Sequence, residues 1–95
     1  MNSQTIIATV LVINPQGLHL RPADMFVKRA MQFQSQIELV KDGLRVDGKS
    51  ILDMLRITTV AVAGAELQLE ATGPDAQAAV DALTELFRQG FGENE

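Results

Sequence analysis

The sequence predicts a single α+β domain in which helices cover one face of an antiparallel sheet. Four segments have β-branched or alternating apolar residues, three have apolar residues at helical spacing, and an Asp42-Gly43 hairpin signal separates two of the expected strands. The chain has 95 residues, 46% of them hydrophobic, which suffices for one core. We therefore expect one domain over residues 1–95, with a core spanning about residues 5–90.

Four strands are expected along the chain. Residues 6–13 are rich in β-branched side chains, and their apolar residues on both faces favour a central place in the sheet. Residues 36–41 and 44–46 alternate on either side of Asp42-Gly43, which is typical of an antiparallel hairpin. Residues 66–71 also alternate, so this last strand should have one face in water.

The first two helices are indicated by spacing and capping. Residues 20–33 have apolar side chains at helical intervals, and the sequence leaves open whether the helix begins at Leu20 or Pro22. Ser50, with Asp53 three residues later, has the arrangement of a capping box, with Asp in place of the usual Glu. A short second helix should therefore begin after Ser50.

A third helix is expected near the C-terminal end. Gly73-Pro74-Asp75 opens it, because proline is tolerated in a first turn and aspartate suits the positive end of the helix dipole. Gly90 can end this helix, and residues 92–95 are expected to fray. The predicted element order is βαββαβα.

The composition excludes several classes of function. The chain has no cysteine and one histidine, so cysteine-based or histidine-rich metal sites are excluded, and we expect neither a metal nor another cofactor. A net charge of −4 disfavours nucleic acid as a partner. No apolar stretch is long enough for a membrane helix, and the first residues lack the basic region of a signal peptide. We expect a cytoplasmic protein without membrane insertion.

The only histidine, His19, stands where the first strand gives way to the first helix. Free backbone N–H groups and the positive end of the dipole form an anion site there, and the Arg21 guanidinium can bind phosphate oxygens. A neutral imidazole supplies a nucleophilic nitrogen. The arrangement predicts a histidine that accepts a phosphoryl group and passes it on. From position alone, a lone histidine near a turn is more often a surface or capping residue, and the alternative for Arg21 is a solvated cation at the helix start.

The heptapeptide GLHLRPA around His19 resembles the active-site signature of the HPr family, the histidine-containing phosphocarriers of the phosphoenolpyruvate-dependent phosphotransferase system. The similarity runs from about Thr9 to Phe87 and includes Phe26-Val27-Lys28, Gly48-Lys49-Ser50-Ile51 and Gly64-Ala65-Glu66. This resemblance implies the HPr-like open-faced sandwich, with four antiparallel strands and three helices on one face.

The resemblance also implies a function and its residues. His19 would accept a phosphoryl group through Nδ1 from phospho-enzyme I and donate it to IIA-type domains, with Arg21 stabilising the group. The protein would be a monomeric carrier and not an enzyme with its own small substrate. Its partner-binding residues would be apolar anchors and cations beside His19, of which at least half of the apolar ones should be core: Leu20, Met25, Lys28, Lys49, Ile51 and Met54.

Ser50 matches the serine that an HPr kinase/phosphorylase modifies in many members of the family. A plain helix-capping role, which requires no modification, is the alternative. The carboxylate of Asp53 is expected to repel a phosphate at this serine.

Two other functions stay open on the sequence alone. An acylphosphatase-like hydrolase would also use an arginine as an anion cradle, with Asn14 as the only interior asparagine that could position a water. A regulatory HPr-like protein would act mainly through partner binding. The sequence does not decide between sugar uptake and a nitrogen-related regulatory branch.

Overall fold

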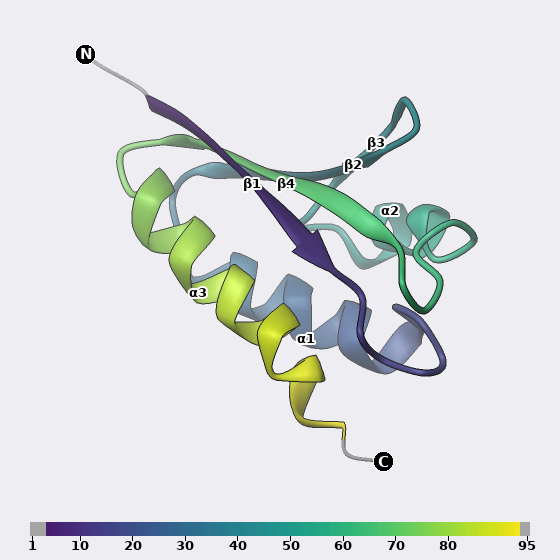
Figure 1. The fold of residues 1–95 in the computed structure, drawn as a ribbon. Helices are drawn as coiled ribbons and strands as arrows, with labels where there is room; N and C mark the ends of the chain where they lie inside the picture. The colour runs from purple at the N-terminus through teal and green to yellow at the C-terminus, as the bar shows by residue number, and fades with distance from the viewer. Residues whose placement is uncertain (1–3, 94–95) are drawn as a thin grey trace.

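The computed structural model describes residues 4–93 (Figure 1). Its elements follow the predicted order βαββαβα, with one additional short 3-10 turn: β1 (Gln4–Leu11), α1 (Leu20–Ala30), β2 (Gln36–Lys41), β3 (Leu44–Asp47), α2 (Ile51–Ile57), β4 (Glu66–Gly73), α3 (Ala76–Arg88) and η1 (Gly90–Gly92). No helix in residues 4–93 is long and apolar enough to cross a membrane.

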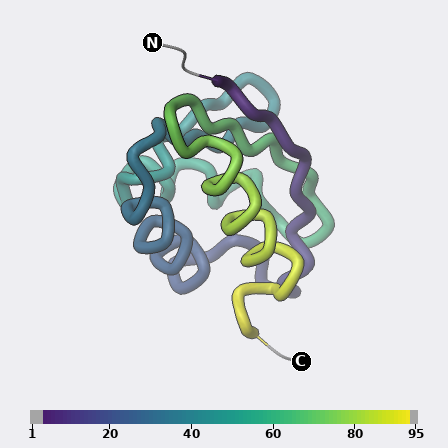
Figure 2. The backbone as a smooth tube through the Cα atoms, turned by 90° about the vertical axis from the view of Figure 1, so that its left-hand side faces the viewer, coloured from purple at the N-terminus to yellow at the C-terminus, as the bar shows by residue number. Residues whose placement is uncertain are grey.

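The strands form one antiparallel sheet in the order β1-β4-β2-β3. The central strand β4 pairs with β1 on one side and β2 on the other, so Leu69 lies opposite both Ala8 and Leu39. The helices cover one face of this sheet, with α1 and α3 side by side and α2 next to β3 (Figure 1) (Figure 2). The predicted open-faced sandwich is therefore confirmed.

The core lies between the sheet and the helices. Inward-facing residues of β4, such as Leu67 and Leu69, are buried against the helices, as the alternation in this strand predicts. Across the core, Phe26 of α1 meets the edge of Phe87 of α3, with ring centroids 6.0 Å apart. This packing joins the middle of α1 to the last turn of α3.

The expected central position of the first strand is wrong, because β1 is an edge strand. The apolar residues on its second face are not covered by another layer: Ile7 is 57% exposed and Leu11 is also exposed. The strand also ends at Leu11, because its ladder partner β4 begins at Glu66. Val12 continues the chain with a hydrogen bond to the carbonyl of Ala65.

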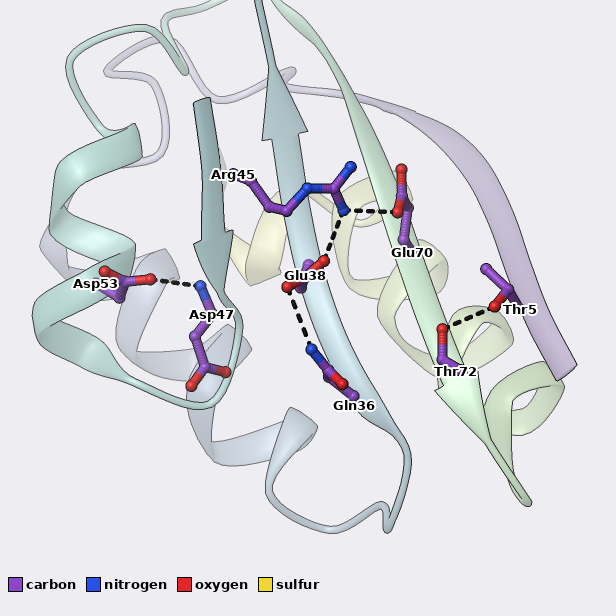
Figure 3. A network of polar contacts seen from close by, with 8 residues as sticks. All are labelled: Thr5, Gln36, Glu38, Arg45, Asp47, Asp53, Glu70 and Thr72. Carbon is purple, nitrogen blue, oxygen red and sulfur yellow. Dashed lines mark hydrogen bonds and ion pairs between the residues drawn. The ribbon is translucent and has the colours of Figure 1, made fainter. Parts of the chain in front are cut away.

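The uncovered face of the sheet has a network of polar contacts between neighbouring strands (Figure 3). Arg45 donates from one guanidinium nitrogen to Glu38 at 2.6 Å and to Glu70 at 2.8 Å. The hydrogen bond to Glu70, and to a smaller extent the one to Glu38, raises the pKa of Arg45. Thr5 and Thr72 share a hydroxyl hydrogen bond of 2.9 Å between β1 and β4. This face is in water, as the alternation in the last strand predicts.

Candidate functional site

A tight turn at Gly17 places His19 directly before α1. Gly17 has a φ of 74°, and a Cβ on it would lie 2.8 Å from the carbonyl oxygen of Ala61. The Gly17 N–H donates to the carbonyl of Asn14, and the Leu18 N–H donates to the carbonyl of Ala61 at 2.8 Å. Only glycine combines the positive φ with this close approach, so the turn depends on it.

His19 is the N-cap residue of α1. Its backbone is extended and its side chain makes no capping hydrogen bond, so the imidazole is available for another role. The side chain is 32% exposed. The helix begins at Leu20, with Pro22 in the first turn, where its missing N–H costs no helical hydrogen bond. Of the two helix starts left open by the sequence, the structure has the one at Leu20.

The start of α1 is electrostatically positive. Its first turn contains no acidic residue, so nothing within that turn neutralises the dipole. Arg21 is exposed in the same turn and forms no salt bridge with a described carboxylate. His19, partly exposed, and Arg21, without a salt bridge to a described carboxylate, thus both lie at the start of α1.

A carboxylate from the other end of the chain contacts the histidine. The Nε2 atom of His19 lies 2.9 Å from Oε2 and 3.2 Å from Oε1 of Glu93. The buried Asn14 donates from Nδ2 to Glu93 Oε1 at 2.6 Å and to the carbonyl of Gly90 at 2.8 Å. Sequence reasoning missed this contact. The expected fraying of residues 92–95 does not extend to Gly92 and Glu93; residues 94–95 lie outside the described part.

A reversal of the chain after α3 brings Glu93 to this position. Gly90, Phe91 and Gly92 all have positive φ values, of 59°, 55° and 75°. The Phe91 ring is buried and packs edge-on against Phe87, with centroids 4.9 Å apart. An apolar residue shortly after the glycine that ends a helix is a signal for such a turn back onto the helix.

Ser50 caps α2 as the sequence predicts. Its Oγ accepts a hydrogen bond from the N–H of Asp53 at 3.2 Å. The Asp53 carboxylate accepts from the N–H of Asp47 at 2.6 Å and from Arg56 at 2.7 Å. The hydrogen bond from the Asp47 N–H lowers the pKa of Asp53 most, and the bond from the Arg56 guanidinium lowers it further. The carboxylate expected to repel a phosphate on Ser50 thus already has two donors of its own.

The expected apolar partner contacts differ in their exposure. Leu20 is 59% exposed beside His19, and Met25 and Ile51 are half-buried. Met54 is fully buried, so its assignment to the partner surface is wrong. It lies on the side of α2 that faces the core, where helical spacing alone cannot separate a core residue from a surface one. Sequence reasoning missed Leu52, which is 77% exposed on α2.

The two expected cations also differ. Lys28 is exposed and pairs with Asp24, one helical turn earlier, at 3.0 Å. Lys49 is half-buried and donates from Nζ to the carbonyl of Phe33 at 2.6 Å. That bond ties the start of α2 to the segment after α1, so Lys49 has a structural role in this arrangement.

Comparison with known proteins agrees with this geometry. A family model described as PTS HPr component phosphorylation site matches residues 6–89. Phosphocarrier protein HPr of Treponema pallidum is 42% identical over 88 residues, which cover 93% of this chain and 98% of that protein. Phosphocarrier protein NPr of Escherichia coli K12 is 31% identical, and the match covers 95% and 99% of the two chains.

The solved structures agree as well. The crystal structure of HPr-C-His from Thermoanaerobacter tengcongensis has a TM-score of 0.88 and 37% identity, and covers 95% of this chain and 99% of that chain. The likeness covers the whole sheet, whose order is β1-β4-β2-β3. This chain belongs to the HPr family of phosphocarrier proteins of the phosphotransferase system.

Proposed function

We propose that this protein carries a phosphoryl group on Nδ1 of His19, accepting it from phospho-enzyme I and passing it to IIA-type domains. The observation that carries this proposal is the position of His19: it is the N-cap of α1, partly exposed, beside a guanidinium with no described carboxylate partner. Family membership supports the same role.

The proposed transfer uses groups that are already in place. The Nδ1 lone pair forms a bond to phosphorus while the bond between phosphorus and the donor's leaving atom breaks, and that electron pair stays with the donor. The phosphoryl oxygens then face the first N–H groups of α1 and the Arg21 guanidinium. The first turn of α1 has no acidic residue, and the Glu93 carboxylate contacts the ring at Nε2, not at Nδ1, where the phosphoryl group would bind.

Docking would use the exposed apolar residues beside the histidine. Leu20 on α1 and Leu52 and Leu55 on α2 are exposed, and α1 packs against α2. Successive partners must each reach the same imidazole, so they would share this surface and bind transiently.

We place this monomeric carrier in the cytoplasm, without a cofactor. A regulatory role is the second candidate, because the catabolite repression HPr of Bacillus subtilis is 38% identical to this chain.

The test is phosphorylation of the purified chain by enzyme I and phosphoenolpyruvate, followed by intact-protein mass spectrometry. The wild type should gain one phosphoryl group, His19→Ala none, and Arg21→Ala should react more slowly. Arg29→Ala removes another exposed arginine of α1 and serves as the matched control, which should react at the wild-type rate. A wild-type protein that stays unmodified would refute the proposal.

We also propose that an HPr kinase/phosphorylase can modify Ser50. The serine is half-buried at the start of α2, next to the exposed Leu52, so a phosphate would add charge to the docking surface. The kinase with ATP should phosphorylate the wild type and leave Ser50→Ala unmodified. If the wild type is also unmodified, Ser50 is a capping residue only, and the role of His19 is unaffected.

A further inference from the structure

We infer that Glu93 is a positioning residue for His19: it holds a proton on Nε2 and so keeps the lone pair on Nδ1. The inference deepens the proposed carrier function and rests on it for its kinetic consequence. Its structural part, the position of the proton, can be tested without any partner protein.

The hydrogen-bond partners of the Asn14 amide fix its orientation. The Gly90 carbonyl can only accept a hydrogen bond, and it lies 2.8 Å from the amide nitrogen of Asn14. The same nitrogen lies 2.6 Å from Glu93 Oε1. A flipped amide would place its oxygen against two acceptors, whereas the present orientation leaves only Oδ1 without a described partner. Asn14 therefore donates to Glu93.

The bond between Glu93 and His19 can have only one direction. An ionised carboxylate has no proton to give, so it can only accept. Nε2 of His19 approaches both carboxylate oxygens, at 2.9 and 3.2 Å, and must therefore be the donor. A neutral imidazole has one N–H, so a proton fixed on Nε2 leaves Nδ1 with its lone pair. Nδ1 makes no hydrogen bond to any residue between 4 and 93.

Glu93 is itself held in place. Phe91 has a φ of 55°, a conformation that a non-glycine residue keeps only when its surroundings enforce it. Its ring is buried against Phe87, which supplies that constraint. The carboxylate is thus held from two sides, by the buried ring two residues earlier and by the amide of Asn14.

The arrangement has a consequence for both halves of the transfer. When Nδ1 bonds to phosphorus, the ring gains positive charge while the Nε2 proton stays on the ring beside the Glu93 carboxylate. When the group leaves, the electron pair of the N–P bond returns to Nδ1 and the same proton is still on Nε2. Glu93 takes no part in bond making, but its charge stabilises the ring, as a carboxylate does for a catalytic histidine.

The test uses Glu93→Ala and Glu93→Gln, with Glu85→Gln as the matched control. Glu85 is exposed on α3 and its side chain pairs with Arg88. It has no described hydrogen bond to His19, Asn14 or Glu93. Because the chain has one histidine, the ring ¹⁵N signals of the unphosphorylated protein belong to His19 without ambiguity. The rate of phosphoryl acceptance from enzyme I is measured on the same samples.

In the wild type we expect the proton on Nε2, with a hydrogen-bonded N–H signal. Glu93→Ala should lose this hydrogen-bonded signal, populate the Nδ1–H form, and accept the phosphoryl group roughly 10- to 100-fold more slowly. Glu93→Gln keeps an acceptor oxygen but not the charge, so it should keep the proton on Nε2 and lose less of the rate. Glu85→Gln should match the wild type in both measurements.

Wild-type ring signals and a wild-type rate in Glu93→Ala would overturn the inference and leave the carrier function standing. A proton on Nδ1 in the wild type would overturn it as well. If the wild type has the expected ring signals but is not phosphorylated, the carrier function fails and the position of the proton stands. The backbone amide spectrum of each variant checks that a rate change does not come from unfolding.

Discussion

Ser35 and Asp75 join the loop after α1 to the start of α3. The Ser35 hydroxyl donates to Asp75 Oδ1 at 2.6 Å, and the Ser35 N–H donates to the same oxygen at 2.9 Å. The N–H of Gln34 donates to the other oxygen, also at 2.9 Å. Although Asp75 is the N-cap of α3, its side chain makes no capping bond; its carboxylate instead serves this loop. The hydrogen bond from the Ser35 hydroxyl lowers the pKa of Asp75 most, and the bond from the Gln34 N–H lowers it further.

We predict that Asp75 makes the protein sensitive to acid. A carboxyl group whose pKa is lower in the folded than in the unfolded state stabilises the fold above its unfolded pKa of about 4. This stabilisation is lost as the pH falls from about 4 through the lower pKa that Asp75 has in the folded protein. Asp75→Asn should therefore be less stable than the wild type near neutral pH, and the difference should shrink in acid.

Urea unfolding over this pH range measures the effect. Asp81→Asn is the control, because Asp81 lies exposed on the same helix and its side chain accepts a hydrogen bond from Gln77 alone among residues 4–93. A stability difference for Asp75→Asn that stays constant from neutral pH into acid would contradict the assigned role.

A second prediction concerns the turn before the histidine. Gly17→Ala should destabilise the protein by about 1–3 kcal/mol, because the new Cβ combines a positive φ with a contact of 2.8 Å to the Ala61 oxygen. Gly43→Ala is the matched control: its φ is also positive, at 83°, but nothing lies within 4 Å of its Cβ. Urea unfolding should show the larger loss for Gly17→Ala. Equal losses would mean that the contact with Ala61 contributes nothing.

A third prediction separates the two sides of α2. Met54→Ala should cost about 2–5 kcal/mol in the free energy of unfolding, because the side chain is fully buried. Leu52→Ala should change stability by no more than about 0.5 kcal/mol, since Leu52 is mostly exposed. With enzyme I as donor, Leu52→Ala should instead raise the KM for this protein. An unchanged KM would remove Leu52 from the docking surface.

Most of the fold follows from local patterns in the sequence. Asp42-Gly43 does form the hairpin turn, and the alternation in residues 66–71 does give a strand with one wet face. The place of β1 could not be found in this way. Ile7 and Leu11 are apolar but face outward at the sheet edge, and the strand order that exposes them is set by pairing with β4, about 60 residues away in the sequence.

The site was predictable only in part for a similar reason. The spacing of His19, Arg21 and Pro22 is local, and the sequence alone indicates a histidine at a helix start. The Glu93 contact spans 74 residues and depends on the buried Asn14. On the sequence alone, Asn14 is a candidate only for positioning a hydrolytic water. The Gly-Phe-Gly sequence after α3 was the available signal, since its phenylalanine requires burial.

The central place of β4 also determines how the molecule exchanges its amide hydrogens with solvent. Both edges of this strand are bonded, to β1 and β2, whereas β1 and β3 each have one neighbour. Edge strands can open locally, but β4 and the other inner strand, β2, are released only when the sheet as a whole comes apart. The amides of Leu67 to Ala71 should accordingly be among the last to exchange, together with those of β2, and their deuteration rate would report the global stability of the native state.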